Sequence, residues 1–259
     1  MNFRDALLST YCENPCQVLP TALWKTLARL ENLQTSFCVE KDVVTKLQAW
    51  NETDLMVYWT RNRERSFDFS QSQTDLNLAL VHRDYLQAFP STRFTLHEPY
   101  FRLIRWQNEP EVNAPLPIGF RIVEVNIQPE ASKVSQLIGQ CYPDLHPTLE
   151  SVLSWVKHPT FDPALWVWVM DNAKGIPAGL GIAEIDKFIL EGSLEWIQVL
   201  PQYRGIGLGK SIVQELLSRL EKRVKFTTVS GQVDNRTNPE AVYRSCGFKG
   251  NDIWWMFTT

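Results

Sequence analysis

The sequence predicts an α/β (α+β) protein, in which a smaller mixed α/β domain precedes a C-terminal mixed sheet flanked by helices. Patterns typical of strands and of helices alternate over residues 119–259. Apolar residues make up 44% of the 259 residues and aromatic residues 12%, which is sufficient for packed cores. A stretch with three prolines in ten residues, 108–117, predicts a linker. We therefore expect a domain of unknown role over 1–115 and a second domain over 118–259.

In the first domain, the sequence predicts one helix and two strands. The helix follows Pro20, with Thr21 as its N-cap and with leucines at helical spacing, Leu23, Leu27 and Leu30. Aromatic and branched residues predict strands over 54–60 and 100–106. His82 and His97 have no spaced partner that would indicate a metal site or a catalytic triad, so we interpret both as packed or solvated histidines.

The second domain shows a more regular alternation of patterns. Leu208, Ile212, Leu216 and Leu220 form the strongest helical stripe, which predicts about four turns. The predicted order is β-α-β-β-β-α-β-α-β. Its elements are strand 119–127, helix 132–142, strands 165–170, 178–185 and 194–199, the helix from 208, strand 224–233, a short helix from Pro239 and strand 252–257.

Charge and composition exclude several classes of protein. The net charge is −3 and basic residues are mixed with acidic ones, so we expect no nucleic-acid partner. No run of about 18 apolar residues occurs, and the N-terminus lacks the pattern of a signal peptide, so we expect no membrane span. The five cysteines are odd in number and spread out, which indicates a reducing, cytoplasmic setting. Cys12 and Cys16 have metal-like spacing but no second pair, so we expect no metal site.

Residues 201–211, "PQYRGIGLGKS", contain three glycines and a Gly-Lys-Ser that suggest a phosphate loop. A Walker A loop needs four residues between its first glycine and the Gly-Lys-Ser, but only three separate Gly205 from Gly209. The last glycine is also misplaced for a dinucleotide-binding fingerprint. A third possibility is a strand that turns through glycines into a helix, because the free amides of the first helical turn favour an anion such as pyrophosphate.

Two motifs in this part of the chain resemble the signatures of the GNAT acetyltransferase superfamily. Gln202-x-x-Gly205-x-Gly207, between a strand and an amphipathic helix, looks like the family's acyl-CoA signature. "NPEAVYRSCGF" is similar to the second signature, which has an Asn, a helix with a Tyr, and a Gly-Phe turn. The resemblance covers about residues 118–259. Asn238 lies five residues before Tyr243, where seven is commoner, so the role of the Asn could belong to Asn235.

The resemblance implies transfer of an acetyl group from acetyl-CoA to a primary amine of a small molecule or a protein. Amides and charged side chains over 204–210 would hold the pyrophosphate, and the Val199 backbone would pair with the pantetheine arm. The residues expected to bind CoA are Ile197, Val199, Gln202, Arg204, Gly205, Ile206, Gly207, Leu208, Gly209, Lys210, Asn235, Asn238 and Tyr243.

Tyr243 and Glu195 are the expected catalytic residues. A phenol with an ordinary pKa of about 10 is protonated at neutral pH, so Tyr243 can donate to the thiolate leaving group; a core tyrosine is the alternative. Glu195 alternates with Ile197 and Val199 and would take the amine proton or hold the ammonium. The alternative is that Glu195 faces solvent or pairs with a cation on a neighbouring strand. Glu184 and Asp186 are weaker candidates of the same kind.

Several questions stay open at the level of sequence. Trp254 and Trp255 either line an acceptor pocket or belong to a core. Cys246 lies beside the site helix but has no His at triad-like positions, so covalent catalysis is not expected. A non-catalytic acyl-CoA sensor or scaffold is the alternative function. The sequence does not identify the acceptor. It also leaves the oligomeric state open, and a homodimer is one of the states that it allows.

Overall fold

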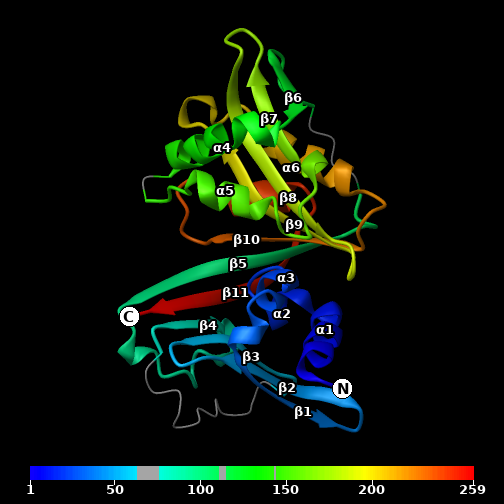
Figure 1. The fold of residues 1–259 in the computed structure, drawn as a ribbon, viewed down its shortest axis with the longest axis vertical. Helices are drawn as coiled ribbons and strands as arrows, with labels where there is room; N and C mark the ends of the chain where they lie inside the picture. Colours follow the sequence, from blue (N-terminus) through cyan, green and yellow to red (C-terminus); the bar gives the residue numbers. More distant parts are fainter. Residues whose placement is uncertain (63–75, 111–114, 143) are drawn as a thin grey trace. The chain divides into compact units, whose positions relative to one another are not determined.

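A computed structural model describes residues 1–62, 76–110, 115–142 and 144–259 (Figure 1). The chain divides into two compact units. The first unit comprises 1–104, 230–240 and 249–259, and the second comprises 105–229 and 241–248. Both contain helices and a sheet with parallel and antiparallel pairs, so the mixed α/β class predicted from the sequence is confirmed.

The two units differ from the domains expected at 1–115 and 118–259. The last strand, β11 (Lys249–Thr258), pairs antiparallel with β4 (Leu78–His82) and with β5 (Leu96–Trp106). These pairings join segments that are distant in sequence, and they make the end of the chain part of the first unit. Of the expected linker over 108–117, residues 111–114 lie outside the described residues.

In the first unit, the strands have the order β1-β2-β3-β4-β11-β5. Strand β3 (Asp54–Thr60) has the predicted bounds. The predicted cap at Thr21 is wrong, because α3 begins two residues later, after Ala22, which provides no side-chain cap. Leu19 and Ala22 are buried, so the chain enters the core before the helix begins. The other described elements are α1 (Phe3–Glu13), α2 (Pro15–Val18), α3 (Leu23–Leu27), β1 (Gln34–Glu40) and β2 (Val43–Trp50).

Both tryptophans of β11 belong to the core of the first unit. Trp254 is 1% exposed, and its indole Nε1 donates a hydrogen bond to the Cys16 carbonyl oxygen at 2.8 Å. Trp255 packs against a cluster that contains Leu55, Tyr58 and Phe257. His82 is also buried, and its Nε2 lies 3.1 Å from Asp252 Oδ1. The core interpretation of these side chains is therefore correct.

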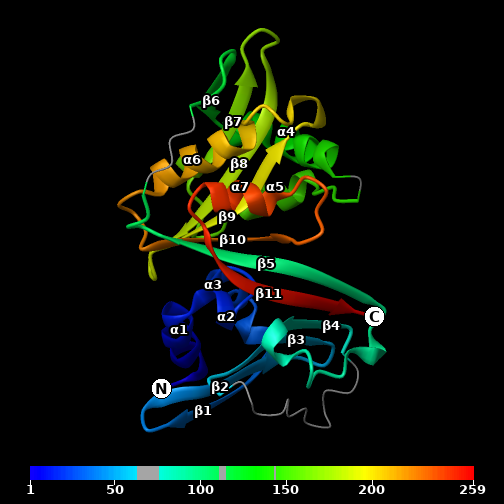
Figure 2. The same cartoon turned by 180° about the vertical axis from the view of Figure 1, so that it is seen from behind.

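In the second unit, the strands have the order β10-β9-β8-β7-β6, and the predicted order of elements along the chain holds with one additional helix, α5. Figures 1 and 2 show α4 and α5 on one face of this sheet and α6 and α7 on the other. The elements are β6 (Phe120–Glu124), α4 (Ile127–Cys141), α5 (Leu149–Trp155), β7 (Trp166–Asp171), β8 (Ile176–Asp186), β9 (Glu191–Val199), α6 (Leu208–Leu220), β10 (Phe226–Gln232) and α7 (Pro239–Ser245).

Helix α6 packs closely on β8 because two strand residues lack side chains. The stripe predicted for this helix is its buried face, with Leu208, Ile212, Leu216 and Leu220 each at most 1% exposed. A Cβ atom at Gly181 would lie 2.4 Å from Ile212 Cγ2, and one at Gly179 would lie 3.1 Å from Ile212 Cδ1. The close contact fixes the start of α6 beside the end of β9.

Candidate active site

The predicted glycine turn connects β9 to α6 and opens to solvent. Gly205 has φ +82° and Gly207 has φ +96°, and a Cβ added at either position would meet no atom within 4 Å. Gly207 is the N-cap of α6 and provides no side-chain hydrogen bond to the first turn. No side chain therefore caps the amides at the start of α6, where the helix dipole favours an anion.

Buried Tyr203 anchors this turn to the second unit. Its hydroxyl donates to Asp171 Oδ2 at 2.8 Å and accepts from Lys174 Nζ at 3.2 Å. The hydrogen bond from Tyr203 is the main reason that the pKa of Asp171 lies below its ordinary value. Sequence reasoning missed this anchor, because Tyr203, Asp171 and Lys174 share no motif.

Arg204 links two elements that border the turn. Its Nε donates to the Val199 carbonyl oxygen at 3.0 Å, and its Nη2 donates to the Cys141 carbonyl oxygen at 3.2 Å. The guanidinium thus joins the end of β9 to the end of α4 while it stays exposed. Gln202 and Ile206 are also exposed, and Lys210 is half-buried near Cys246.

One edge of β9 has no strand partner along its second half within the described second unit. There β10 pairs in parallel with β9 over Glu191–Leu194. On the other edge, the amide of Leu200 donates to the Ala178 carbonyl oxygen at 3.0 Å. Main-chain groups of successive strand residues point to opposite edges, so those of Ile197 and Val199 point away from β8. An extended ligand can pair with the amides of Ile197 and Val199.

Glu195 lies at a β-bulge in β9. Trp196 is opposite Ile182 on β8 and Leu194 is opposite Ala183, which leaves Glu195 as the extra residue. The simple alternation expected for Glu195, Ile197 and Val199 is therefore interrupted at the carboxylate. A bulge redirects a side chain. Glu195 is half-buried and directly follows Leu194, the last residue of β9 that pairs with β10.

Tyr243 is buried in α7 and is only 8% exposed. Burial raises its pKa above the ordinary value, and the proximity of Tyr142, Cys246 and Glu195 raises it further. Tyr142 and Glu195 therefore each lie near Tyr243 in the second unit. The phenol of Tyr243 stays protonated at neutral pH, as a proton donor must.

Tyr142 borders the candidate site, and sequence reasoning did not single it out. It directly follows α4 and is half-exposed. Its hydroxyl oxygen accepts a hydrogen bond from Gln198 Nε2 at 3.2 Å. Neither Tyr142 nor Gln198 belongs to a motif of the glycine turn or of α7, so only the packing of α4 on the sheet brings them to the site.

The other candidates have local structural partners. The Asp186 Oδ1 atom accepts from the amides of Phe188 and Ile189 at 2.9 and 3.3 Å in the β8–β9 turn. Glu184 is buried in β8. Burial raises the pKa of the Cys246 thiol, which disfavours the nucleophilic thiolate.

Asn235 and Asn238 lie in the first unit, in the segment before α7. The Asn235 side-chain oxygen accepts hydrogen bonds from the Thr237 amide at 2.9 Å and from the Thr237 hydroxyl at 2.7 Å. Asn238 has φ +48° and precedes Pro239, the first residue of α7. Both asparagines therefore shape the turn into the helix that carries Tyr243.

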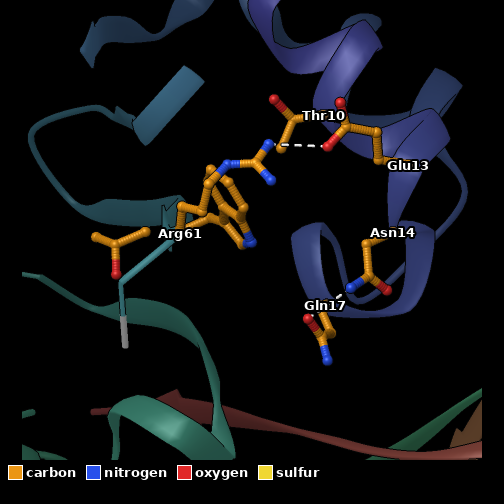
Figure 3. Close-up of a pocket in the computed structure, with 7 residues that line it drawn as sticks. Thr10, Glu13, Asn14, Gln17 and Arg61 are labelled. Carbon is orange, nitrogen blue, oxygen red and sulfur yellow. Dashed lines mark hydrogen bonds and ion pairs between the residues drawn. The ribbon is translucent and has the colours of Figure 1, made fainter. Parts of the chain in front are cut away.

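A separate pocket of about 260 Å³ opens in the first unit at α1, α2 and the end of β3 (Figure 3). Arg61 Nη2 pairs there with Glu13 Oε2 at 2.8 Å. None of the residues expected to bind CoA lines it. The lining residues are Thr10, Glu13, Asn14, Gln17, Trp59, Thr60 and Arg61.

The described ranges contain no group of three or more His, Cys, Asp or Glu side chains arranged to hold a metal ion. No helix in these ranges has the length and apolar character needed to cross a bilayer.

Residues 163–250 match the Acetyltransferase (GNAT) domain family. A GNAT-family acetyltransferase from Colwellia psychrerythraea has a similar fold, with TM-score 0.62 and 11% identity over 98% of this chain and 96% of that one. A Drosophila protein gives TM-score 0.63 and 14% identity over 100% and 97% of the two chains.

A GCN5-related N-acetyltransferase from Sphaerobacter thermophilus gives TM-score 0.62 and 16% identity over 70% of this chain. The match spans 58% of the Sphaerobacter chain. No curated protein matches the sequence. At these identities the solved structures establish the fold, and the mixed sheet flanked by helices is of the GNAT type.

Proposed function

We propose that this chain, whose residues 163–250 carry a GNAT acetyltransferase domain, transfers an acetyl group from acetyl-CoA to a primary amine. The observation that carries the proposal is the uncapped glycine turn at the start of α6, next to the edge of β9 that has no strand partner in the described second unit. The acceptor is a small molecule or a protein amine.

The glycine turn and β9 supply the groups that acetyl-CoA needs. The amides from Gly205 to Lys210 would hold the pyrophosphate, with the Lys210 charge nearby. The Ile197 and Val199 amides would pair with the pantetheine arm as an added strand does. The Val199 carbonyl accepts from Arg204, so its amide is the group available for the arm. Asn235 and Asn238 would act through the turn that begins α7.

The transfer is a direct attack of the amine on the thioester. The amine nitrogen forms a bond to the acetyl carbon, the carbon–sulfur bond breaks, and Tyr243 gives its proton to the sulfur. Glu195, at the bulge of β9, takes the proton that the amine loses, or holds the ammonium form before attack. The raised pKa of Tyr243 keeps the donor protonated before the reaction.

Ligand-induced thermal stabilisation tests the donor. A ligand at about 100 times its dissociation constant stabilises a protein by about 2.7 kcal/mol, which shifts the unfolding transition measurably. We expect acetyl-CoA and CoA to stabilise the chain more than ATP or NAD does. Absence of stabilisation by saturating acetyl-CoA would contradict the proposal. Stabilisation without CoA release, over a panel of amines, would indicate a non-catalytic acyl-CoA sensor or scaffold.

A further inference from the structure

The pocket of the first unit combines buried side chains with an ion pair that water can reach. Its volume is about 260 Å³. Pockets for drug-sized ligands have volumes of about 300–1,000 Å³, so this pocket suits a smaller molecule. Thr10, Trp59 and Thr60 are the buried part of its lining, at 2%, 7% and 4% exposure. Glu13 and Arg61 form the ion pair (Figure 3), and their side chains are 61% and 42% exposed.

Some N–H donors of the lining have no acceptor among the described residues. The Arg61 guanidinium donates through Nε to the Val44 carbonyl oxygen at 3.0 Å and through Nη2 to Glu13 at 2.8 Å, which leaves Nη1. The indole Nε1 of Trp59 and the side-chain Nε2 of Gln17 likewise donate to no described atom. A ligand that accepts hydrogen bonds would satisfy these donors, and a carboxylate would also meet the charge of the guanidinium.

The lining also offers hydrogen-bond acceptors. Arg61 takes only the Oε2 atom of Glu13, so Oε1 has no donor within the described part of the chain. The amide of Asn14 donates through Nδ2 to Gln17 Oε1 at 2.6 Å, which directs that N–H to Gln17 and leaves Asn14 Oδ1 as an acceptor. A ligand with a cationic N–H group would satisfy both oxygen atoms.

The distance between the two charges indicates which ligand fits both. Arg61 Nη2 lies 2.8 Å from Glu13 Oε2, so a ligand that meets both side chains must carry an anion and a cation on neighbouring atoms. The carboxylate and the ammonium of an α-amino acid have this arrangement. A simple carboxylate or a simple amine would compensate only one of the two charges. An exposed ion pair contributes little to stability, so its partners can turn to a ligand.

We propose that this pocket binds a free α-amino acid. The carboxylate of the ligand accepts from Arg61, Trp59 Nε1 and Gln17 Nε2. Its ammonium group donates to Glu13 Oε1 and Asn14 Oδ1. The Trp59 ring, whose centroid lies 5.5 Å from Arg61 Cζ, adds aromatic surface beside these groups. The inference goes beyond acetyl transfer and does not depend on it, because no residue expected to bind CoA lines the pocket.

Titration of the full chain with each of the common α-amino acids, followed by ligand-observed NMR, tests the class of ligand. We expect at least one amino acid to bind. Its amide lacks the carboxylate and its N-acetyl derivative lacks the ammonium, so we expect each to bind roughly tenfold or more weakly. Glucose is the neutral comparison. The proposal is overturned if no amino acid has a dissociation constant below about 10 mM, or if glucose or the amide binds as tightly as the best amino acid.

Substitutions in the lining test the place of binding. Glu13→Gln and Arg61→Gln each remove one charge, and we expect each to weaken amino-acid binding roughly tenfold. Arg61→Lys keeps the charge but loses the planar guanidinium, so its affinity should lie between those of the wild type and Arg61→Gln. Arg29→Gln is the matched control, since it removes an exposed arginine of the first unit that does not line the pocket. Wild-type affinity in both Glu13→Gln and Arg61→Gln would overturn the proposal.

The same proteins separate this inference from the proposed function. Glu13→Gln alters only an exposed side chain, so we expect it to keep the unfolding temperature and the CoA affinity of the wild type. A chain that binds an amino acid through Glu13 and Arg61 but does not bind acetyl-CoA contradicts only acetyl transfer. Amino-acid binding that Tyr243→Phe weakens and Glu13→Gln does not would assign the ligand to the second unit and overturn this inference.

Discussion

The Glu195 carboxylate lies close enough to Tyr243 to raise the pKa of the phenol, although one residue comes from a bulge in β9 and the other from α7. The residues that we propose as the base for the amine and the acid for the thiolate are thus neighbours in the second unit. The pair places both proton transfers of the proposed reaction at the edge of β9.

Replacement of Tyr243 tests the acid. We expect Tyr243→Phe to lower kcat by roughly 10²-fold, because the thiolate loses its proton donor. The KM for acetyl-CoA should change by less than about twofold, since most of the donor-binding groups are main-chain amides. Steady-state CoA release with an amine panel provides both constants. A large rise in KM with unchanged kcat would show that Tyr243 serves binding only.

Replacement of Gly207 tests the anion site. In Gly207→Ala, φ +96° becomes strained, at a cost of about 1–2 kcal/mol. The strain changes the turn that presents the α6 amides. We expect CoA affinity, measured by calorimetry, to fall roughly tenfold. Gly119→Ala is the matched control, because Gly119 has φ +94° and equally open surroundings. The same loss of affinity in both variants would contradict the assignment.

Replacement of Arg204 separates a structural link from a phosphate ligand. The guanidinium bonds two carbonyl oxygens, of Val199 and Cys141, which one ammonium group cannot reproduce in the same geometry. We expect Arg204→Lys and Arg204→Gln to lower the free energy of unfolding by a similar amount, about 1 kcal/mol. Chemical denaturation measures this effect. If only Arg204→Gln weakens CoA binding, and by tenfold or more, the charge of Arg204 is a phosphate ligand instead.

Alkaline pH should destabilise the fold through Tyr243. Its pKa is raised in the folded chain, so above about pH 10 the unfolded chain loses this proton first. The contribution to stability is complete below the ordinary tyrosine pKa and is lost as the pH rises above it. Between about pH 9 and about pH 11, we expect the free energy of unfolding to fall less in Tyr243→Phe than in the wild type. Chemical denaturation at each pH measures this free energy. Parallel losses would contradict the burial of an ionisable phenol.

The second unit was largely predictable because its elements carry local signals. The leucine and isoleucine stripe of α6, the glycines before it and the Pro239 start of α7 each depend on neighbours within a few residues. Strands β7, β8 and β9 lie where the patterns predicted them, within a few residues.

Features set by distant contacts were not predictable from the same patterns. The pairing of β11 with β4 and β5 gives the end of the chain to the first unit, which the proline-rich stretch does not indicate. The bulge at Glu195 depends on the register with β8, and the position of Tyr142 depends on how α4 packs. Periodicity reports which face of an element is apolar, and it carries no information on register or on the partner.

The most direct test of acetyl transfer is CoA release from acetyl-CoA by the wild-type chain over a panel of small amines and peptides, beside Tyr243→Phe. The predicted result is release that depends on one class of amine, with the acetylated amine identified by mass spectrometry, and that falls roughly 10²-fold in the variant. No release above the uncatalysed rate from the wild type, or equal release by both proteins, would contradict the account.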